Sequence, residues 1–370
     1  MAEAKSVATA PTDALGSTGQ PARKPKVAFY HATLPKTAGR KGGVEAAVHR
    51  LANALVARDN VELTVFSSGE PPADALYAHR RVLDKFNRSQ LTRLFISPLL
   101  LNRLPFDDAD VVHLHGDDWF FVKRGRPSVR TMYGSAWHEA RTAKKLKRKL
   151  SQALVFVLEK LAVRLATVNV SIGQQTSDIY GADHVIGMSV DRAIYRPAEK
   201  SETPTVFFVG GWTERKRGEF MFQTFVDQVL PAMPDAQLLM VSDYCPPHPS
   251  VTWLRDQSDA DLAAAMARAW VFGYPSLYEG FGIAYIEAMA CGTAIVTTDN
   301  AGAQDVLEHG KYGDIVPDPE FGPALLRLLS DSSRRTTLER QGLAHVDKYA
   351  IDSIAAANEA VYREAIQKWG

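Results

Sequence analysis

The sequence has few cysteines, no long apolar run and no excess of either charge. Its two cysteines, Cys245 and Cys291, exclude a disulfide framework and have no metal-binding spacing, so we expect a reduced, cytoplasmic protein. The 43 Lys and Arg residues balance 42 Asp and Glu residues, which argues against a nucleic-acid-binding protein. No uninterrupted apolar stretch is long enough to cross a bilayer.

The first 25 residues differ in composition from the rest of the chain. They consist largely of Ala, Thr, Pro, Ser and Gly and lack the apolar core of a signal peptide, so we expect residues 1–25 to form a disordered tail. Of the 370 residues, 46% are hydrophobic, which is enough for two domains of ordinary size.

Beyond this tail, short β-branched runs alternate with longer helical patterns. The strand-like runs of the first half are 26–30, 61–66, 110–115 and 168–171. The rhythm then restarts with the runs 205–209, 237–241, 271–274 and 294–297. This alternation is typical of parallel sheets with crossover helices. It predicts two α/β domains, each doubly wound and Rossmann-like.

The stretch 195–204 separates the two series of strands. It contains two prolines and four charged residues, so we expect an inter-domain linker there. The domains would then span residues 26–194 and 205–350, followed by a helix over 351–370. Ligands of open parallel sheets bind at the carboxyl ends of the strands. Two such domains would therefore form a binding site in the cleft between them.

The stretch 275–292 is the strongest candidate for this site. Glu279 follows a predicted strand, and Gly280 and Gly282 precede a predicted helix that contains Glu287. Backbone amides at the start of a helix favour an anion, and ionised carboxylates accept hydrogen bonds from hydroxyls. The arrangement suits a sugar nucleotide, although two spaced acids alone are more often solvated on a helix surface.

A second glycine-containing turn spans 209–218. Gly210 and Gly211 follow a predicted strand, and Arg215 and Lys216 come next. Their fixed positive charge could stabilise a departing diphosphate. Charged turns are also ordinary solvated features, so both interpretations stay open.

Two more features stand at the ends of predicted strands in the first half. Gly42 and Gly43 open a helix, without the G-x-G-x-x-G dinucleotide fingerprint. Any Rossmann-like domain needs a tight turn at such a point. His113 and His115 end another strand, where a histidine can reach a cleft or be hydrogen-bonded for structural reasons.

These stretches resemble the family 4 retaining glycosyltransferases over roughly residues 26–365. The signature of that family is a Glu, seven residues and a second Glu, which Glu279 and Glu287 match in the context Pro-Ser-x-x-Glu-Gly-Phe-Gly. Gly210 and Lys216 match its Gly-x-x-x-x-x-Lys element. The resemblance implies a GT-B fold, in which two Rossmann-like domains face a central cleft and the last helix crosses back to the first domain.

The resemblance also implies roles for individual residues. The catalytic candidates are Glu279, Lys216, Arg215 and His115. The donor-binding candidates are Glu287, Gly280, Phe281, Gly282, Ile283, Gly210, Gly211, Gly42 and Gly43. Glu279 and His115 would face the donor sugar, and Glu287 would bind the ribose hydroxyls. No cofactor and no metal are implied, because Arg215 and Lys216 would neutralise the diphosphate of the donor.

The sequence departs from the family pattern at several positions. Gly211 stands where many members have Arg, and Asp305 stands where Glu is commoner. Residues 187–189 are Gly-Met-Ser in place of Pro-Asn-Gly. Tyr133 replaces a histidine, and His138 follows five residues later, so both are acceptor-side candidates.

The reaction implied is transfer of a sugar from a nucleotide diphosphate sugar, built on UDP or GDP, to an acceptor hydroxyl with retention of configuration. It would serve the synthesis of a glycan, a glycolipid or a glycosylated metabolite, with a carbohydrate, lipid-linked or small-molecule acceptor. No second carboxylate stands as an obvious nucleophile, so we favour same-face attack assisted by the leaving phosphate. The alternatives are a non-catalytic sugar-nucleotide-binding protein and a sugar-nucleotide epimerase.

The stretch 141–149 is strongly basic, with six cations among its nine residues, and apolar residues follow it. Such a segment could contact anionic lipid at the inner face of the membrane. It could also hold a phosphorylated acceptor. Charge runs are commonly solvated helix faces, and the three interpretations stay open.

Overall fold

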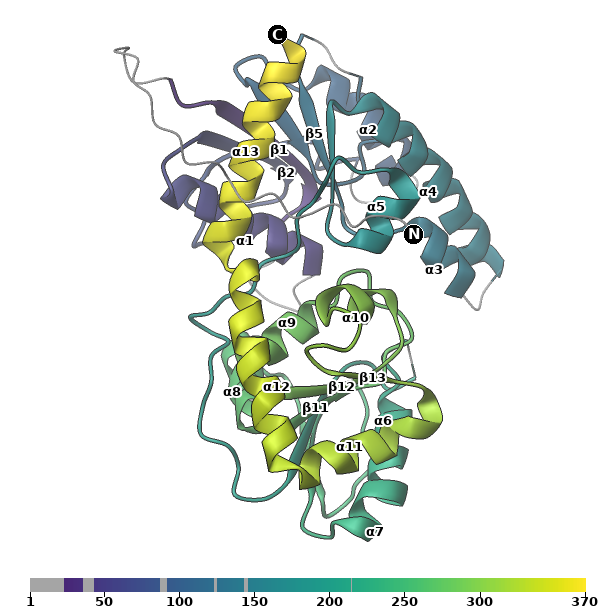
Figure 1. The fold of residues 1–370 in the computed structure, drawn as a ribbon. Helices are drawn as coiled ribbons and strands as arrows, with labels where there is room; N and C mark the ends of the chain where they lie inside the picture. Colours follow the sequence, from purple (N-terminus) through teal and green to yellow (C-terminus); the bar gives the residue numbers. More distant parts are fainter. Residues whose placement is uncertain (1–22, 36–42, 87–91, 123–124, 143–145, 214) are drawn as a thin grey trace, which may run out of the picture.

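The computed structural model describes residues 23–35, 43–86, 92–122, 125–142, 146–213 and 215–370. It contains two α/β domains, one above the other, each built on a parallel sheet (Figure 1). The predicted fold class is confirmed. Within the described ranges, no helix combines the length and the apolar character that crossing a bilayer demands.

The sheet of the first domain has the strand order β3-β2-β1-β4-β5-β6-β7. The strands are β1 (Lys26–Thr33), β2 (Glu62–Ser68), β3 (Ala78–Arg81), β4 (Val111–Leu114), β5 (Ser128–Met132), β6 (Val168–Ser171) and β7 (His184–Val185). The helices are α1 (Gly43–Ala57), α2 (Ser97–Leu100), α3 (Ala136–Thr142), α4 (Leu146–Leu165) and α5 (Gln174–Tyr180), with short turns at Thr92–Ile96 and Leu101–Arg103. Neighbouring strands are parallel, so their carboxyl ends lie at one edge.

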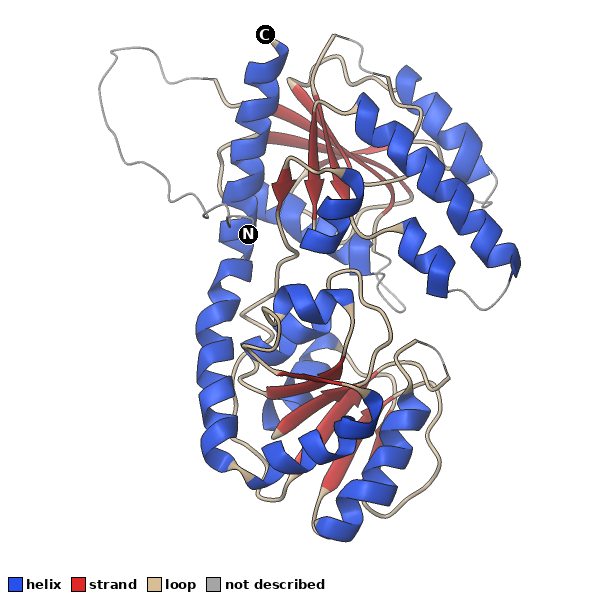
Figure 2. Ribbon diagram, turned by 45° about the vertical axis from the view of Figure 1, so that its right-hand side comes forward, coloured by secondary structure: helices blue, strands red, loops and turns tan. Residues whose placement is uncertain are grey.

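The sheet of the second domain has the order β10-β9-β8-β11-β12-β13, also parallel. The strands are β8 (Thr205–Val209), β9 (Gln237–Val241), β10 (Val251–Leu254), β11 (Val271–Tyr274), β12 (Ala294–Thr298) and β13 (Asp314–Val316). The helices are α6 (Gly218–Thr224), α7 (Leu230–Ala232), α8 (Asp259–Arg268), α9 (Ile283–Ala290), α10 (Ala301–Val306), α11 (Phe321–Ser330) and α12 (Ser332–His345), with turns at Phe225–Val229, Asp318–Glu320 and Val346–Tyr349. Helices flank both sheets (Figure 2).

The last helix, α13 (Ile351–Trp369), begins at the second domain and lies along the first (Figure 1). Its apolar side chains, among them Ile354 and Val361, join the core of the first domain. The buried Glu359 pairs with Arg58 at 2.7 Å, and the Tyr362 hydroxyl hydrogen-bonds Nδ1 of His113 at 2.9 Å. The chain therefore crosses between the domains twice, once before β8 and once at α13.

The segment between the two sheets is anchored more firmly than its composition indicates. Tyr195 is buried, although it lies in the segment predicted to be a linker. The Nζ atom of Lys200 donates to the carbonyl oxygens of Ala269 and Gly292, at 2.8 and 2.7 Å. The first of the two crossings is thus held against the second domain by side chains that composition alone assigns to solvent.

Candidate active site

Glu279 lies in the loop that follows β11, and its carboxylate is held from three directions. Its Oε1 atom accepts hydrogen bonds from the hydroxyls of Tyr274 at 2.9 Å and Ser276 at 2.8 Å, and pairs with Nη1 of Arg215 at 2.5 Å. Burial, followed by the charge of Glu279, raises the pKa of Tyr274 well above its ordinary value. Tyr274 therefore remains a hydroxyl donor, and Glu279 has a fixed orientation at the cleft.

Gly282 and Tyr285 define how α9 begins. Gly282 has a φ of 89° and directly precedes the helix. Glycine adopts this left-handed conformation without strain, and a Cβ atom there would collide with the Tyr285 ring. The Tyr285 hydroxyl is fixed by Thr297 at 2.8 Å and by Asn300 at 2.9 Å. The sequence at 282–285 thus turns the amide groups of the helix start towards the cleft.

Glu287 lies on α9 and is partly buried. Burial raises its pKa to about 7, while the nearby charges of Arg50 and Lys216 and a hydrogen bond with Tyr195 act in the opposite direction. Arg50 belongs to α1 of the first domain, and its Nε atom is buried without a hydrogen-bond partner among the described residues. The sequence analysis missed Arg50 and Tyr195, because neither stands in a strand-end turn.

The turn after β8 brings Lys216 back over the end of the strand. A Cβ atom at Gly210 would lie only 2.6 Å from Cβ of Lys216, so this approach requires glycine. The Nζ atom of Lys216 lies 5.3 Å from the centre of the Tyr274 ring. Arg215 bonds to the carbonyl oxygen of Tyr278 as well as to Glu279. Arg215 therefore pairs with the carboxylate of Glu279, and Lys216 lies over the ring of Tyr274, whose hydroxyl also bonds to Glu279.

Arg217 is a further residue that the sequence analysis missed. It has a left-handed backbone, with a φ of 56°. Its guanidinium donates to the Pro275 carbonyl oxygen at 2.7 Å and to both carboxylate oxygens of Asp318 at 2.6 and 2.7 Å. Such a bidentate pair fixes geometry as well as charge. Arg217 thus connects the basic turn to the loop that carries Glu279.

The first domain contributes His115 and Tyr133 at the ends of β4 and β5. Nδ1 of His115 and the Tyr133 hydroxyl are 2.8 Å apart. Burial, followed by the nearby His113 and His31, lowers the pKa of His115 well below its ordinary value, so the ring is neutral. Nε2 of His115 is buried and has no hydrogen-bond partner in the described part of the chain. The hydrogen-bonding capacity of this nitrogen is therefore unused by the described part of the protein.

The other two histidine candidates of the first domain, His113 and His138, lie in different surroundings. Both ring nitrogens of His113 are used, by Tyr362 and by Thr131, which supports the structural interpretation of His113. The His138 ring stacks on Tyr278 across the cleft, with centroids 5.8 Å apart. Thus Tyr133 lies beside His115, whereas His138 lies beside the loop of Glu279.

Glycine allows the two domains to approach each other closely. A Cβ atom at Gly43 would lie 3.7 Å from Cδ1 of Ile283, and one at Gly280 would lie 3.4 Å from the carbonyl oxygen of Tyr133. Gly42 lies outside the described residues. The predicted donor-binding residues on either side of the cleft therefore meet around the start of α9.

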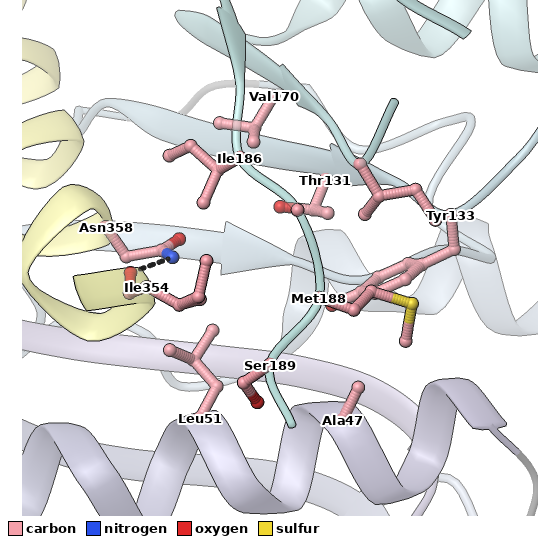
Figure 3. Close-up of a pocket in the computed structure, with 12 residues that line it drawn as sticks. Ala47, Leu51, Thr131, Tyr133, Val170, Ile186, Met188, Ser189, Ile354 and Asn358 are labelled. Carbon is pink, nitrogen blue, oxygen red and sulfur yellow. Dashed lines mark hydrogen bonds between the residues drawn. The ribbon is translucent and has the colours of Figure 1, made fainter. Parts of the chain in front are cut away.

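Two cavities of the described structure are lined by neither Glu279, Glu287 nor Lys216. One, of about 30 Å³, lies within the first domain and is lined by Tyr133, Met188 and Leu51 among others (Figure 3). The other, of about 1070 Å³, lies between α5, α10 and the start of α13, and its polar lining includes Gln175 and Asp305. It opens beside the loop of Glu279, because Phe281 also lines it.

No cluster of three His, Cys, Asp or Glu side chains able to hold a metal occurs in the described ranges. The spacing Asp-x-Asp, a pattern that can bind a metal, occurs twice in the sequence and ends at Asp110 and at Asp261. The first ends in an ion pair of Asp110 with Arg23 at 2.6 Å. In the second, Asp261 and Ser258 form the capping box of α8. Both carboxylates therefore have structural partners away from the cleft.

Comparison with solved structures gives the same architecture. Sucrose-phosphate synthase from Thermosynechococcus elongatus aligns with a TM-score of 0.72 at 19% identity, covering 92% of this chain and 98% of the other. HepE of Anabaena, in complex with UDP and glucose, aligns with a TM-score of 0.69 at 15% identity, covering 92% and 100%. The fold is GT-B, the class of glycosyltransferases with two facing Rossmann-like domains.

Comparison of the sequence with known families narrows this class. Residues 41–191 match the model of Glycosyltransferase Family 4, and residues 203–331 match the model of Glycosyl transferases group 1. Phosphatidyl-myo-inositol mannosyltransferase of Mycobacterium leprae is 28% identical over 356 residues, 87% of this chain and 92% of the relative. A D-inositol 3-phosphate glycosyltransferase of Stackebrandtia nassauensis is 30% identical over 125 residues, 32% of this chain and 28% of the relative.

The chain belongs to family 4 of the glycosyltransferases. It is a retaining enzyme that uses a nucleotide diphosphate sugar as donor, which confirms the predicted reaction class. The two alternatives, a non-catalytic binding protein and an epimerase, receive no support from these relatives.

Proposed function

We propose that this enzyme transfers a hexosyl residue, with mannosyl the first candidate, to a hydroxyl of a lipid-linked acceptor of the inositol type. The relative that matches along most of the chain is named for mannosyl transfer to phosphatidyl-myo-inositol, and a second relative is named for an inositol phosphate. The observation that carries the catalytic part is the carboxylate of Glu279, which pairs with Arg215 and accepts a hydrogen bond from Tyr274, the residue over which Lys216 lies.

In this proposal, the second domain binds the donor. Lys216 and Arg215 neutralise the diphosphate, and the amides of Gly280, Phe281, Gly282 and Ile283 bind sugar hydroxyls or phosphate. The further donor-binding candidates are Gly42, Gly43, Gly210 and Gly211. Glu287 accepts hydrogen bonds from the ribose hydroxyls, and Glu279 accepts one from the sugar. Positive charge beside the departing phosphate stabilises the transition state.

His115 acts as a neutral hydrogen-bonding group rather than as an acid or base, because burial keeps its pKa low. The bond between the sugar C1 and the phosphate oxygen breaks while C1 bonds to the acceptor oxygen on the same face. The acceptor proton passes to the departing phosphate oxygen, so no side chain has to carry it. Tyr133 and His138 are the acceptor-side candidates, and no metal is required. A glycosyl adduct trapped on any side chain would contradict this route.

Nucleotide binding tests the donor site directly. Isothermal calorimetry with UDP and GDP should give binding of one nucleotide by the wild type and at least tenfold weaker binding by Glu287→Ala. The exposed Glu199, in the segment between the domains, provides a matched control in Glu199→Ala. Transfer from the corresponding mannose and glucose donors, measured with and without EDTA, then tests the sugar and the metal. Equal affinity of Glu287→Ala and wild type would contradict the assignment of Glu287.

For the location of the enzyme, the proposal is peripheral contact with an anionic membrane through the basic stretch 141–149 and α4. Helix α4 exposes one apolar stripe at helical spacing, with Leu146, Leu150, Leu154, Val157 and Leu161 exposed by 39 to 70%. Its other face packs Leu158 and Ala162 against Trp119. The exposed cations Lys147, Arg148 and Lys149 accompany the stripe. An amphipathic helix with flanking cations suits the headgroup region of an anionic bilayer.

Vesicle flotation tests this contact. The wild type should float with vesicles containing anionic phosphatidylglycerol and not with pure phosphatidylcholine, and high salt should weaken the binding. Leu150→Glu combined with Val157→Glu should abolish flotation, whereas Leu76→Glu, at an apolar residue exposed elsewhere, should not. If the double variant instead dissociated a wild-type dimer and left flotation unchanged, the stripe would be a protein interface and the membrane proposal would be wrong.

A further inference from the structure

Helix α10 joins the loop of Glu279 to the first domain. The amide of Gly302 donates to the carbonyl oxygen of Glu279 at 3.0 Å. One helical turn later, a carboxylate oxygen of Asp305 accepts a hydrogen bond from the backbone amide of Gln175, at 3.4 Å. Gln175 belongs to α5, which is part of the first domain. A single short helix thus touches both walls of the cleft.

Helix α5 has no side chain of its own to cap its start. Its N-cap residue is Gly173, and no side-chain cap is present there. Ser, Thr, Asp or Asn usually fills this position, because the first amides of a helix have no partner within it. Here the carboxylate of Asp305 approaches those amides from the other domain. A Cβ atom at Gly173 would lie 2.7 Å from Oδ2 of Asp305, so the glycine makes room for the capping group.

The connection from α10 to the Glu279 loop has little freedom. A Cβ atom at Gly302 would lie 2.6 Å from the carbonyl oxygen of Phe281 and 2.9 Å from Cβ of Glu279. Asn300 caps α10 at 3.0 Å and also donates to the Tyr285 hydroxyl at 2.9 Å. Close packing of this kind transmits displacement instead of absorbing it. Asp305 and Glu279 therefore move as one unit.

We propose that Asp305 is a positioning residue, which caps α5 across the cleft when the domains close and thereby sets Glu279 against the first domain. This inference rests on the proposed role of Glu279. Asp305 touches no reacting atom in this scheme. Asp305 stabilises the closed arrangement of the two domains, in which α5 and α10 are in contact. Domain closure and the placement of Glu279 therefore occur together.

Asp305→Ala and Asp305→Asn test the proposal, with Asp299→Asn as the matched control. Asp299 is an exposed carboxylate at the end of the neighbouring strand, and it accepts a hydrogen bond from Gln304 of its own domain at 2.6 Å. We expect kcat/KM to fall about tenfold in Asp305→Ala, since loss of an N-cap costs that much in a conformational equilibrium, and to fall less in Asp305→Asn, whose amide oxygen can still accept the bond from Gln175. Asp305→Glu should recover most of the loss.

Hydrogen exchange of α5 gives the readout that a merely structural residue would not change. In the wild type, the amides of Gln174 and Gln175 should gain protection when the donor nucleotide binds, and this gain should disappear in Asp305→Ala. Wild-type kcat/KM with unchanged protection in Asp305→Ala would overturn the proposal. Equal losses in the Asp299 control would overturn it as well.

Failure of the proposed function has a different signature. If no sugar nucleotide supported transfer by the wild type, the role of Glu279 would be wrong. Exchange at Gln174 and Gln175 in the unliganded protein would still report the cap, as faster exchange in Asp305→Ala than in the Asp299→Asn control.

Discussion

The two walls of the cleft are built differently. The second-domain wall holds Glu279 by a tyrosine, a serine and an arginine, and the loop beneath it is fixed again by Arg217. The first-domain wall presents His115, which is held through one ring nitrogen, while the other nitrogen has no partner among the described residues. A wall that is already ordered suits the constant part of the reaction, the donor. The first wall keeps one unused nitrogen of His115 for the donor sugar, and the acceptor-side candidate Tyr133 lies beside it.

The sharpest test of this contrast is Glu279→Gln. The amide has the size of the carboxylate but loses its charge, so the pair with Arg215 and the orientation towards the donor sugar are lost. We expect kcat to fall about 10³-fold, the scale for removing one preorganised electrostatic group. Single-turnover assays measure this, and an unchanged melting temperature shows that folding is intact.

A substitution at His115 tests whether the first wall contributes less to the chemistry than the second wall does. His115→Asn should reduce kcat less than Glu279→Gln does, because His115 is neutral. An equal or larger loss in His115→Asn would mean that the first wall carries the chemistry and that the contrast is wrong.

The pH dependence of donor binding reports on Glu287. Burial raises its pKa to about 7, and the ionised form is the one that accepts hydrogen bonds from ribose hydroxyls. Affinity for the intact sugar nucleotide should therefore rise about tenfold between pH 6 and pH 8, as the free enzyme becomes ionised. Calorimetry across this range measures the trend.

Glu287→Gln is the control for this trend, because an amide does not titrate. Its affinity should be low and independent of pH. Using the intact donor avoids the titration of a terminal phosphate near pH 6. A wild-type affinity that fell as the pH rose would contradict the role of ionised Glu287.

A smaller effect is expected at Tyr133, where the chain departs from the family. Tyr133→Phe removes the hydroxyl that bonds to His115 and leaves a buried nitrogen without a partner. Unfolding should become easier by about 1–3 kcal/mol, and kcat should fall about fivefold if His115 then turns by a fraction of an ångström.

Tyr133→His is the matched variant, because it restores a hydrogen-bonding ring of the type common in the family. It should retain kcat within about threefold of the wild type, provided that a ring nitrogen reaches His115. If Tyr133→Phe had full activity and stability, the His115–Tyr133 bond would have no role in the first wall.

Local patterns made much of the fold and of the second wall predictable. The runs 168–171 and 205–209 are strands with those bounds, since buried β-branched runs are read directly. The edge strands β3 and β7 were missed because they are short and partly exposed, which leaves no apolar pattern. Glu279 and Glu287 stand eight positions apart, so their places on the loop after β11 and on α9 follow from the sequence.

Contacts between distant segments could not be predicted in this way. Asp305 meets Gln175 across 130 positions, and Arg50 approaches Glu287 only because α1 faces α9. The left-handed backbone of Arg217 is likewise set by its partners in the folded loop, since arginine has no preference for that conformation. Such features depend on how the two domains meet, which no local pattern encodes.

The smallest kinetic effect is expected at Tyr362, which lies on α13 and not in the cleft. Tyr362→Phe removes the hydroxyl that bonds to Nδ1 of the buried His113. Since His113 uses both nitrogens for structure, the variant should lose about 1–3 kcal/mol of unfolding free energy and keep kcat and KM within about twofold. Urea denaturation and steady-state assays measure the two quantities. A selective loss of kcat would mean that α13 acts on His115 through the His113 ring, which lies 3.9 Å from the His115 ring, and that the first wall is more constrained than its hydrogen bonds indicate.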